Sequence, residues 1–451
     1  MSKLPLSIPD GYELTEHGVF PKEWDIKAIG EIASVSSGGT PNRKVKDFWD
    51  GDIPWVTTTL INGNDISYAN EFITKKGLES SSAKMCKAGT ILMAMYGQGK
   101  TRGKAGALTI DASINQACAA IEVNSSDSGE YILHTLNYMY EDIRELSNSG
   151  GQENLSSGII KGIKLPLPSK SEQTAIANAL SDVDALLTEL EKLIAKKQAI
   201  KTATMQHLLT GKTRLPQFAT YTEGEKQGQQ KGTKPSELGE VPEDWDVQTV
   251  YELAEGQKSL FDDGDWIEAE YITDKGVRLI QTGNIGVGRY QEKENKKYIS
   301  ESSFIKLKCK ELKQGDLLIC RLAEPAGRAC IFPDIGEEKI ITSVDVTIFR
   351  PPVETVNREY LLHYFSTNEW FSSVLEQVGG TTHKRISRGA LGRIRVPMPK
   401  LAEQTAIATI LSDMDNEIQT LEQRLAKTRQ IKQGMMQELL TGRTRLPFDK
   451  E

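Results

Sequence analysis

A glycine-rich stretch that carries three cations, Gly97–Lys104 (GQGKTRGK), is the first place where this sequence could do chemistry. A phosphate-binding P-loop has Gly, four residues, and then Gly-Lys-Ser/Thr. Here five residues separate Gly97 from Gly103, and Ala105 follows Lys104, where the Mg²⁺-binding hydroxyl belongs. The stretch therefore does not predict nucleotide binding, although a basic loop of this type can approach phosphates without ATP.

Other groups that could act as catalysts or metal ligands are scattered along the chain. The five histidines have no metal-ligand spacing, and none of the five cysteines forms a C-x-x-C. The carboxylates of Pro333–Lys339 (PDIGEEK) lie in one short loop, whereas a metal-dependent nuclease needs carboxylates that converge from neighbouring strands. His134 and His363 fall on predicted helices, where a packing role is the simpler interpretation. The sequence predicts no catalytic residue and no metal site in this chain.

Polar and basic side chains in glycine-rich loops are better suited to contact a nucleic acid. Gln377–Lys400 contains six basic residues and no acid. In the major groove Arg and Lys pair with guanine, and Asn and Gln pair with adenine, while phosphates are held by cations, hydroxyls and backbone amides. The candidate DNA-binding residues are Gln98, Lys100, Thr101, Arg102, Lys104, Gln152 and Asn154 in the first half of the chain, and Arg321, Arg328, Thr381, Thr382, His383, Lys384, Arg385 and Arg388 in the second.

The elements that must position these loops belong to an internal repeat. Glu172–Pro216 and Glu403–Pro447 align without gaps at an offset of 231 residues, with 26 identities over 45 positions. The segments before them match more loosely, as in PKEWDI (Pro21–Ile26) and PEDWDV (Pro242–Val247). The chain therefore consists of two similar frames that carry divergent segments.

The repeated blocks predict two long helices that end near Gly211 and Gly442, residues that favour a left-handed C-terminal conformation. About 40 residues at ~1.5 Å each would make a helix roughly 60 Å long. Apolar residues recur with a period of 3.5, which is typical of a coiled-coil seam, and we expect the two helices to pack antiparallel. The predicted seam residues are Ile176, Leu180, Val183, Leu187, Leu190, Ile194, Ile407, Leu411, Met414, Ile418, Leu421 and Leu425.

Length, composition and net charge limit the classes of protein to which this chain can belong. The 451 residues suffice for two or three domains, and no apolar run is long enough to cross a membrane. The N-terminus has no apolar region typical of a secretory signal, so we expect a cytoplasmic protein. The net charge of −7 argues against a uniformly basic polyanion binder, but the candidate loops are locally basic. The polar stretch Ala219–Lys234 predicts a flexible linker.

With these motifs in place, the sequence resembles the specificity subunits of type I restriction–modification systems. The resemblance rests on Pro21–Thr58 (PKEWDI, GGTPNRK and GDIPWVTT), on Lys164–Leu187, and on the duplicated LLTGKTRLP and LLTGRTRLP. The second divergent segment departs from the pattern at its start, where Gly256–Ile280 replaces the GGTPNRK stretch.

The resemblance implies an α+β chain with two pseudo-repeated target recognition domains separated by two long antiparallel coiled-coil helices. The expected boundaries are 1–168 for the first recognition domain, 169–216 for the first helical region, 217–237 for a linker, 238–399 for the second recognition domain, and 400–451 for the second helical region. Each recognition domain would read one half of a bipartite double-stranded DNA target, and the helices would fix the spacer.

The resemblance also implies partners that carry the chemistry. Two modification subunits would bind S-adenosylmethionine and methylate adenine N6 on a flipped base. Restriction subunits, which are motor–nucleases, would use ATP and Mg²⁺, and this chain would hold no cofactor of its own. An alternative is a scaffold or decoy that binds modification subunits without reading DNA. A self-sufficient methyltransferase is disfavoured, because the only Pro-Pro pair, Pro351–Pro352, lacks the flanking residues of a base-holding loop.

Overall fold

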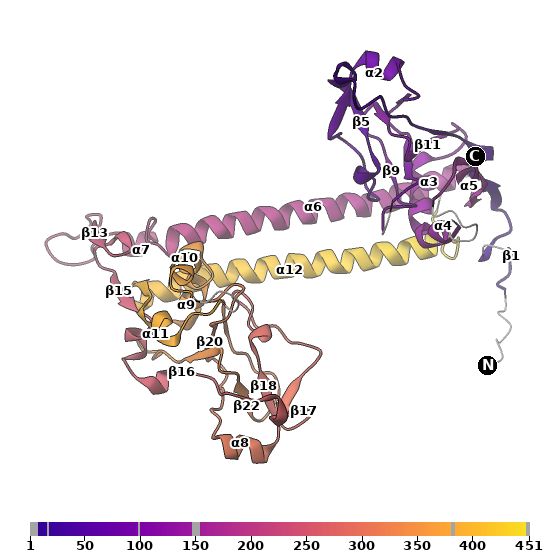
Figure 1. Ribbon diagram of the computed structural model, residues 1–451. Coiled ribbons are helices and arrows are strands. Elements are labelled where there is room, and N and C mark those ends of the chain that lie inside the picture. The colour runs from indigo at the N-terminus through magenta and orange to yellow at the C-terminus, as the bar shows by residue number, and fades with distance from the viewer. Residues whose placement is uncertain (1–7, 16–17, 98–99, 147–153, 380–383, 448–451) are drawn as a thin grey trace. The chain divides into compact units, whose positions relative to one another are not determined.

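The computed structural model describes residues 8–15, 18–97, 100–146, 154–379 and 384–447 (Figure 1). The chain divides into two compact units: unit 1 comprises Met1–Glu191 and Gln423–Glu451, and unit 2 comprises Lys192–Glu422. Each unit contains one divergent segment, part of α6 (Lys170–Leu208) and part of α12 (Leu401–Leu439). The structure confirms the prediction of mixed helices and strands, and both long helices occur where the repeat predicts them.

Unit 1 contains two four-stranded sheets, in the orders β4-β11-β8-β9 and β6-β5-β10-β7. Within the second sheet, β5 and β10 run parallel, with Val56 opposite Ile114. A further antiparallel pair, β3 and β12, joins the two ends of the divergent segment. The strands are β1 (Tyr12–Thr15), β2 (Gly18–Pro21), β3 (Asp25–Ala28), β4 (Ala33–Ser37), β5 (Trp49–Val56), β6 (Glu71–Ile73), β7 (Met85–Cys86), β8 (Ile91–Ala94), β9 (Ala105–Ala107), β10 (Ala112–Ile114), β11 (Cys118–Val123) and β12 (Lys164–Leu167).

Unit 2 repeats this topology except at one edge of the second sheet, where β17 lies beside β19 while unit 1 has β7 beside β10. Its sheets have the orders β16-β23-β20-β21 and β17-β19-β18-β22, and β18 and β22 run parallel with Ile280 opposite Thr342. The pair β15 and β24 corresponds to β3 and β12. The strands are β13 (Thr233–Ser236), β14 (Gly239–Pro242), β15 (Asp246–Thr249), β16 (Phe261–Asp263), β17 (Ile272–Thr273), β18 (Val277–Ile280), β19 (Lys297–Ile299), β20 (Leu317–Cys320), β21 (Ala329–Ile331), β22 (Ile340–Thr342), β23 (Val346–Phe349) and β24 (Arg395–Met398).

Short helices occur between the strands in each unit. Many begin at a Ser, Thr or Asn that accepts a hydrogen bond from the third backbone amide of the first turn, as Ser128 does for α3 and Asn357 for α9. The helices are α1 (Ile29–Ile32), α2 (Lys75–Glu79), α3 (Gly129–Tyr138), α4 (Tyr140–Leu146) and α5 (Ser157–Gly162) in unit 1, and α7 (Pro216–Ala219), α8 (Glu301–Leu307), α9 (Arg358–Tyr364), α10 (Asn368–Glu376) and α11 (Arg388–Arg393) in unit 2.

The ends of the long helices belong to the cores of the units. In unit 1, Leu180 of α6 and Leu439 of α12 are buried together with strand residues such as Ile121. In unit 2, Leu208 of α6 and Leu411 of α12 are buried with Leu317 of β20. The first predicted seam residues of each helix, Ile176 and Leu180 and then Ile407 and Leu411, therefore also anchor a divergent segment. The seam beyond them stays a prediction, with Leu190, Ile194 and Ile418 buried and Val183, Leu187, Met414, Leu421 and Leu425 half-buried.

Ion pairs join α6 to α12 inside each unit. In unit 1, Lys432 pairs with Asp184 at 2.5 Å and Arg429 with Glu191 at 2.6 Å. In unit 2, Lys197 pairs with Glu417 at 2.7 Å, and Lys201 pairs with Asp415. Residue numbers rise along α6 as the partner numbers fall along α12, so the paired segments run antiparallel in both units.

The repeated LLTG-x-TRLP motif holds the end of one long helix against the start of the other. In unit 2, Arg214 donates to both oxygens of Glu403, the Nε contact at 2.6 Å and the Nη2 contact at 2.7 Å. Its Nη1 donates to Asp244 at 2.7 Å, and its guanidinium lies 5.6 Å from the ring centroid of Trp245. Although burial alone would raise it, hydrogen bonds from Arg214 and Lys231 lower the pKa of Asp244 to about 2.

Unit 1 repeats this arrangement, which we call the arginine clasp, with Arg445, Glu172, Glu23 and Trp24. Gly211 and Gly442 precede the two arginines and have φ of +73° and +69°. A Cβ at Gly211 would lie 2.5 Å from the ring of Pro242, and one at Gly442 would lie 2.5 Å from that of Pro21. These glycines are therefore required both by their backbone conformation and by close packing.

The stretch predicted as a flexible linker differs from that expectation. Tyr221 hydrogen-bonds Glu243, and Lys231 pairs with Asp244 at 2.7 Å, so the stretch folds back on unit 2. Its last residues form β13, whose hairpin with β14 corresponds to the β1–β2 hairpin of unit 1. Composition suggested a linker because polar side chains here bind one another instead of filling a core. The domain boundaries given above stay predictions.

Candidate nucleic-acid interface

The predicted DNA-binding residues fall into several environments. Gln98, Gln152, Thr381, Thr382 and His383 lie outside the residues that the structure describes. In unit 1, Lys100 and Asn154 are exposed, while Thr101, Arg102 and Lys104 are half-buried in the turn between β8 and β9. The hydroxyl of Tyr140 donates to the backbone carbonyl of Lys100 at 2.6 Å, which fixes that turn against α4. DNA contact by these residues stays a prediction.

Two of the predicted arginines of unit 2 are directed into the protein. Arg328 donates to four backbone carbonyls, those of Ile285, Leu322, Pro325 and Thr282, at 2.7 to 3.0 Å. Arg321 is only 3% exposed and donates to the carbonyls of Ile386 at 3.2 Å and Val344 at 2.5 Å. Because these guanidinium groups satisfy loop carbonyls, their placement favours a structural role over base contact.

The remaining cations of this group lie nearer the surface. Arg388 pairs with Asp262, and Arg385 pairs with Asp345 at 3.0 Å with 39% of its side chain exposed. Lys384 is exposed. The backbones of Arg385 and Gly379 form an antiparallel bridge. The acids that neutralise Arg388 and Arg385 lie far away in the sequence, so a count of local charge cannot detect them.

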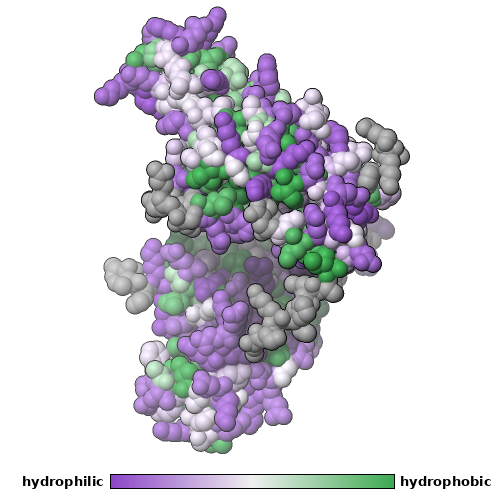
Figure 2. Space-filling model, turned by 90° about the vertical axis from the view of Figure 1, so that its right-hand side faces the viewer, coloured by the Kyte–Doolittle hydropathy of each residue, from purple (hydrophilic) through white to green (hydrophobic). Residues whose placement is uncertain are grey.

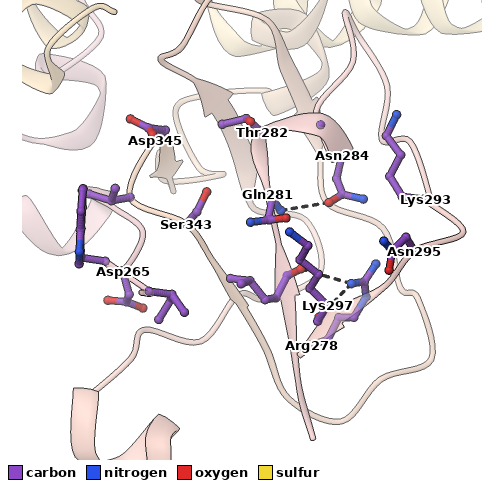
Figure 3. Close-up of a pocket in the computed structure, with 15 residues that line it drawn as sticks. Asp265, Arg278, Gln281, Thr282, Asn284, Lys293, Asn295, Lys297, Ser343 and Asp345 are labelled. Carbon is purple, nitrogen blue, oxygen red and sulfur yellow. Dashed lines mark hydrogen bonds between the residues drawn. The ribbon is translucent and has the colours of Figure 1, made fainter. Parts of the chain in front are cut away.

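Three loops meet at one end of the parallel strand pair in unit 2, and sequence reasoning did not place them together. They are residues 264–267 after β16, 281–284 after β18 and 343–345 after β22, and we call them the three-loop surface. They line a polar cavity of about 380 Å³ together with Lys293, Asn295 and Lys297 (Figure 3). Figure 3 shows Gln281 between Ser343 on one side and Asn284 on the other.

Buried polar groups hold the floor of this cavity. Asn284 accepts from the backbone amide of Gln281 at 3.0 Å and donates to the carbonyl of Gln291 at 2.9 Å. Arg278, 1% exposed, donates to the carbonyl of Lys297 at 3.1 Å and to Glu292 at 2.8 Å. The floor is therefore rigid, while Lys293, Asn295 and Trp266 on the rim are exposed.

The same loops occur in unit 1, where they are residues 38–41, 57–60 and 115–117. The amide of Asn115 donates to the backbone carbonyl of Val56 at 3.0 Å, and the amide of Ser343 donates to the backbone carbonyl of Ile280 at 3.0 Å. The amide of Gly38 donates to the backbone carbonyl of Cys118 at 3.3 Å, and the amide of Gly264 donates to the backbone carbonyl of Val346 at 2.9 Å. Gly264 and Asp265 thus occupy the positions of Gly38 and Gly39, since the amides of Asp265 and Gly39 also donate to the equivalent carbonyls of Thr342 and Ile114. The second segment keeps these backbone hydrogen bonds with different side chains, although the stretch that follows is two residues shorter before the parallel strand.

One sequence signal could have found these loops. In both halves an apolar run ends in polar residues, Val56-Thr57-Thr58-Thr59 in the first and Ile280-Gln281-Thr282 in the second. Each polar stretch begins just after the parallel strand and continues into a 3₁₀ turn, η2 (Thr58–Leu60) or η6 (Thr282–Asn284). Only the structure brings the other two loops to this position.

The histidines of the helical frame form a repeated pair. His134 lies 3.2 Å from the hydroxyl of Ser181 in unit 1, and His363 lies 3.2 Å from that of Ser412 in unit 2. Burial, and secondarily the charges of Lys432 and Lys201, lower the pKa of each histidine to about 4. Both imidazoles are therefore neutral at pH 7, and each packs between a short helix and a long helix.

The part of the surface seen in Figure 2 is mostly polar. Hydrophilic residues cover most of the face in Figure 2, and hydrophobic residues occur there in small groups. No helix among the described residues is long and apolar enough to cross a membrane. In the same part of the chain, no cluster of three or more His, Cys, Asp and Glu residues could hold a metal ion.

Comparison with known proteins identifies the class. The family model described as the type I restriction modification DNA specificity domain matches twice, over residues 21–202 and 242–430. The chain is 26% identical to the MjaVIII specificity subunit of Methanocaldococcus jannaschii over 95% of both chains, and 31% identical to the MjaIX specificity subunit of the same organism over 40% of this chain and 42% of the relative. A type I restriction–modification S subunit from M. genitalium has the same fold, with a TM-score of 0.56, 14% identity, and coverage of 97% and 98% of the two chains.

The two family matches span most of both halves of the chain, and the double match agrees with the repeated topology of units 1 and 2. The chain belongs to the type I restriction–modification specificity family. It is a specificity component of such a system and not its catalytic component, as the motif search predicts.

Proposed function

We propose that each unit reads one half of a bipartite DNA target and that α6 and α12 fix the spacer between the halves as an antiparallel coiled coil. The observation that carries this proposal is the repeated frame: the two units share the first sheet, the parallel strand pair of the second sheet and the hydrogen bonds of its loops, but have different polar side chains at equivalent loop positions. A pair of modules that reads different sequences needs this combination, because the frame sets the position of the loops and the side chains set the bases.

Partner subunits supply the chemistry in this proposal. Two modification subunits would carry S-adenosylmethionine and methylate adenine N6, and restriction subunits would use ATP and Mg²⁺, in the cytoplasm. The net charge of −7 supports a division of labour in DNA binding. Affinity for DNA depends strongly on cations that neutralise phosphates, so the isolated chain should bind DNA weakly and the partners should add phosphate contacts.

Methylation in a reconstituted complex tests the proposal. The chain should be co-expressed with a type I modification subunit from its own host, and methylated adenines should then be mapped across the host genome. We expect N6-methyladenine at a bipartite motif with a fixed spacer, and no methylation without the chain. A complex that assembles but leaves the DNA unmethylated, or methylates it without a motif, would support the scaffold or decoy instead.

A further inference from the structure

We propose that Gln281 reads an adenine in the half-site recognised by unit 2, and that Lys293 and Lys297 hold the adjacent phosphates. This inference rests on the proposed function and names the specificity-determining residue of the second half-site. None of the three was among the residues predicted from the sequence to contact DNA.

The position of Gln281 is the first argument. It is the first residue after the central parallel strand β18, and its carboxamide lines the open polar cavity (Figure 3). A carboxamide can donate its N–H to adenine N7 and at the same time accept from the N6 amino group through its oxygen, which makes Gln a bidentate partner of the adenine edge in the major groove.

Rigidity around Gln281 is the second argument. Asn284 fixes its backbone amide, and Thr342 donates to the carbonyl of the preceding Ile280 at 3.0 Å. The neighbouring loop is held from beneath by Arg321, which donates to the carbonyl of Val344. A side chain that discriminates between bases needs such support, because a mobile carboxamide would adapt to any base edge.

Charge around the cavity is the third argument. Lys293 and Lys297 stand on one side of it, and the two acids on the other side, Asp265 and Asp345, are already neutralised. Asp265 accepts from the backbone amide of Lys310 at 2.7 Å with the ammonium of the same residue 3.5 Å away, and Asp345 pairs with Arg385. The cavity is therefore open to a polyanion from the lysine side.

Comparison of the two units is the fourth argument. Thr57 occupies the position of Gln281 in unit 1, and its hydroxyl lies 2.7 Å from that of Thr59. The backbone hydrogen bonds around the two residues are the same. The two units therefore keep one backbone conformation at this position and differ in the side chain that would contact a base. The half-site read by unit 1 should accordingly have a different requirement at the corresponding base pair.

The experiment uses the complete methyltransferase complex with Gln281→Thr, which installs the residue of unit 1. We expect discrimination at one A·T pair of the second half-site to fall about 5- to 150-fold, the range of one bidentate base contact, with the first half-site unchanged. Gln227→Thr, on an exposed turn outside the lining of the cavity, is the matched control and should leave the motif intact. Replacement of that adenine by 7-deazaadenine should weaken binding of the wild-type complex and add nothing to Gln281→Thr.

Different failures have different meanings. If the wild-type complex yields no bipartite motif, the proposed function itself fails. If the wild type yields a motif but Gln281→Thr leaves it unchanged, weakens all positions equally, or alters a G·C pair, only the inference about Gln281 is overturned. A Gln281→Glu variant guards against misfolding, because it keeps the size of the side chain and should also lose discrimination at the same base pair.

Discussion

At the scale of single residues, some polar side chains hold loops in place from within, and others line an open cavity. Arg321 and Arg328 are cations in a locally basic stretch, yet they hold loop carbonyls from within. Gln281 carries no charge and was not among the residues that the sequence predicts to contact DNA, but it lies at the centre of the three-loop surface. A basic residue in a loop therefore predicts DNA contact only when no carboxylate or carbonyl from another part of the chain binds its side chain.

The repeated histidines give a prediction at this scale. His134 and His363 have folded-state pKa values of about 4, whereas an unfolded histidine has one near ~6.5. Between these values the unfolded chain binds more protons, so the stability present above pH 6.5 is lost as the pH falls toward 4. We expect a loss of about 2 kcal/mol per histidine at pH 5.

Urea unfolding at pH 7 and pH 5 measures this loss. His134→Gln and His363→Gln should each reduce the difference between the two pH values, whereas His207→Gln, on an exposed ring, is the matched control. An unchanged pH dependence in both buried variants would show that other groups cause it.

At the scale of elements, the arginine clasp connects the end of one long helix, the start of the other and the first strands of a divergent segment. Glu172 is 1% exposed and Glu403 is 2% exposed, so each carboxylate depends on its arginine for compensation. Removing one partner of a buried pair leaves an uncompensated charge, which costs more than the pair itself contributes.

Arg214→Ala should therefore lower the free energy of unfolding by about 3–5 kcal/mol. The double variant Arg214→Met with Glu403→Gln should lose less, because it removes both charges and Trp245 can still donate to the new carboxamide. Lys212→Ala, two residues earlier and exposed, controls for the truncation. Thermal unfolding would contradict the prediction if Arg214→Ala were as stable as Lys212→Ala.

At the scale of the whole molecule, we interpret α6 and α12 as the part that sets the DNA spacer. The boundary between units 1 and 2 falls after Glu191 in α6 and after Glu422 in α12. Insertions at these two places would leave the ion pairs of unit 1, such as Lys432–Asp184, and those of unit 2, such as Lys197–Glu417, in their registers.

Four residues inserted at both places would add about 6 Å of helix. We expect the recognised spacer to lengthen by about one or two base pairs, at ~3.4 Å each, while both half-sites stay the same. Mapping of methylated adenines in cells that express the variant gives the answer. Altered half-sites with the old spacer would mean that the helices do not measure the distance.

The sequence by itself determined the features that depend on local or periodic patterns. The duplication follows from sequence identity at a fixed offset, and the two long helices follow from a 3.5-residue period of apolar residues. The left-handed conformation of Gly211 and Gly442 follows from the residue type at the end of each helix. Only the tertiary structure decided which polar groups meet. The three-loop surface combines segments that strand pairing brings together from distant parts of the chain, and the same pairing places Gly264 and Asp265 on the backbone positions of Gly38 and Gly39. Long-range pairing is set by the packing of the whole core, so a local pattern cannot show whether an arginine faces a phosphate or a buried carbonyl.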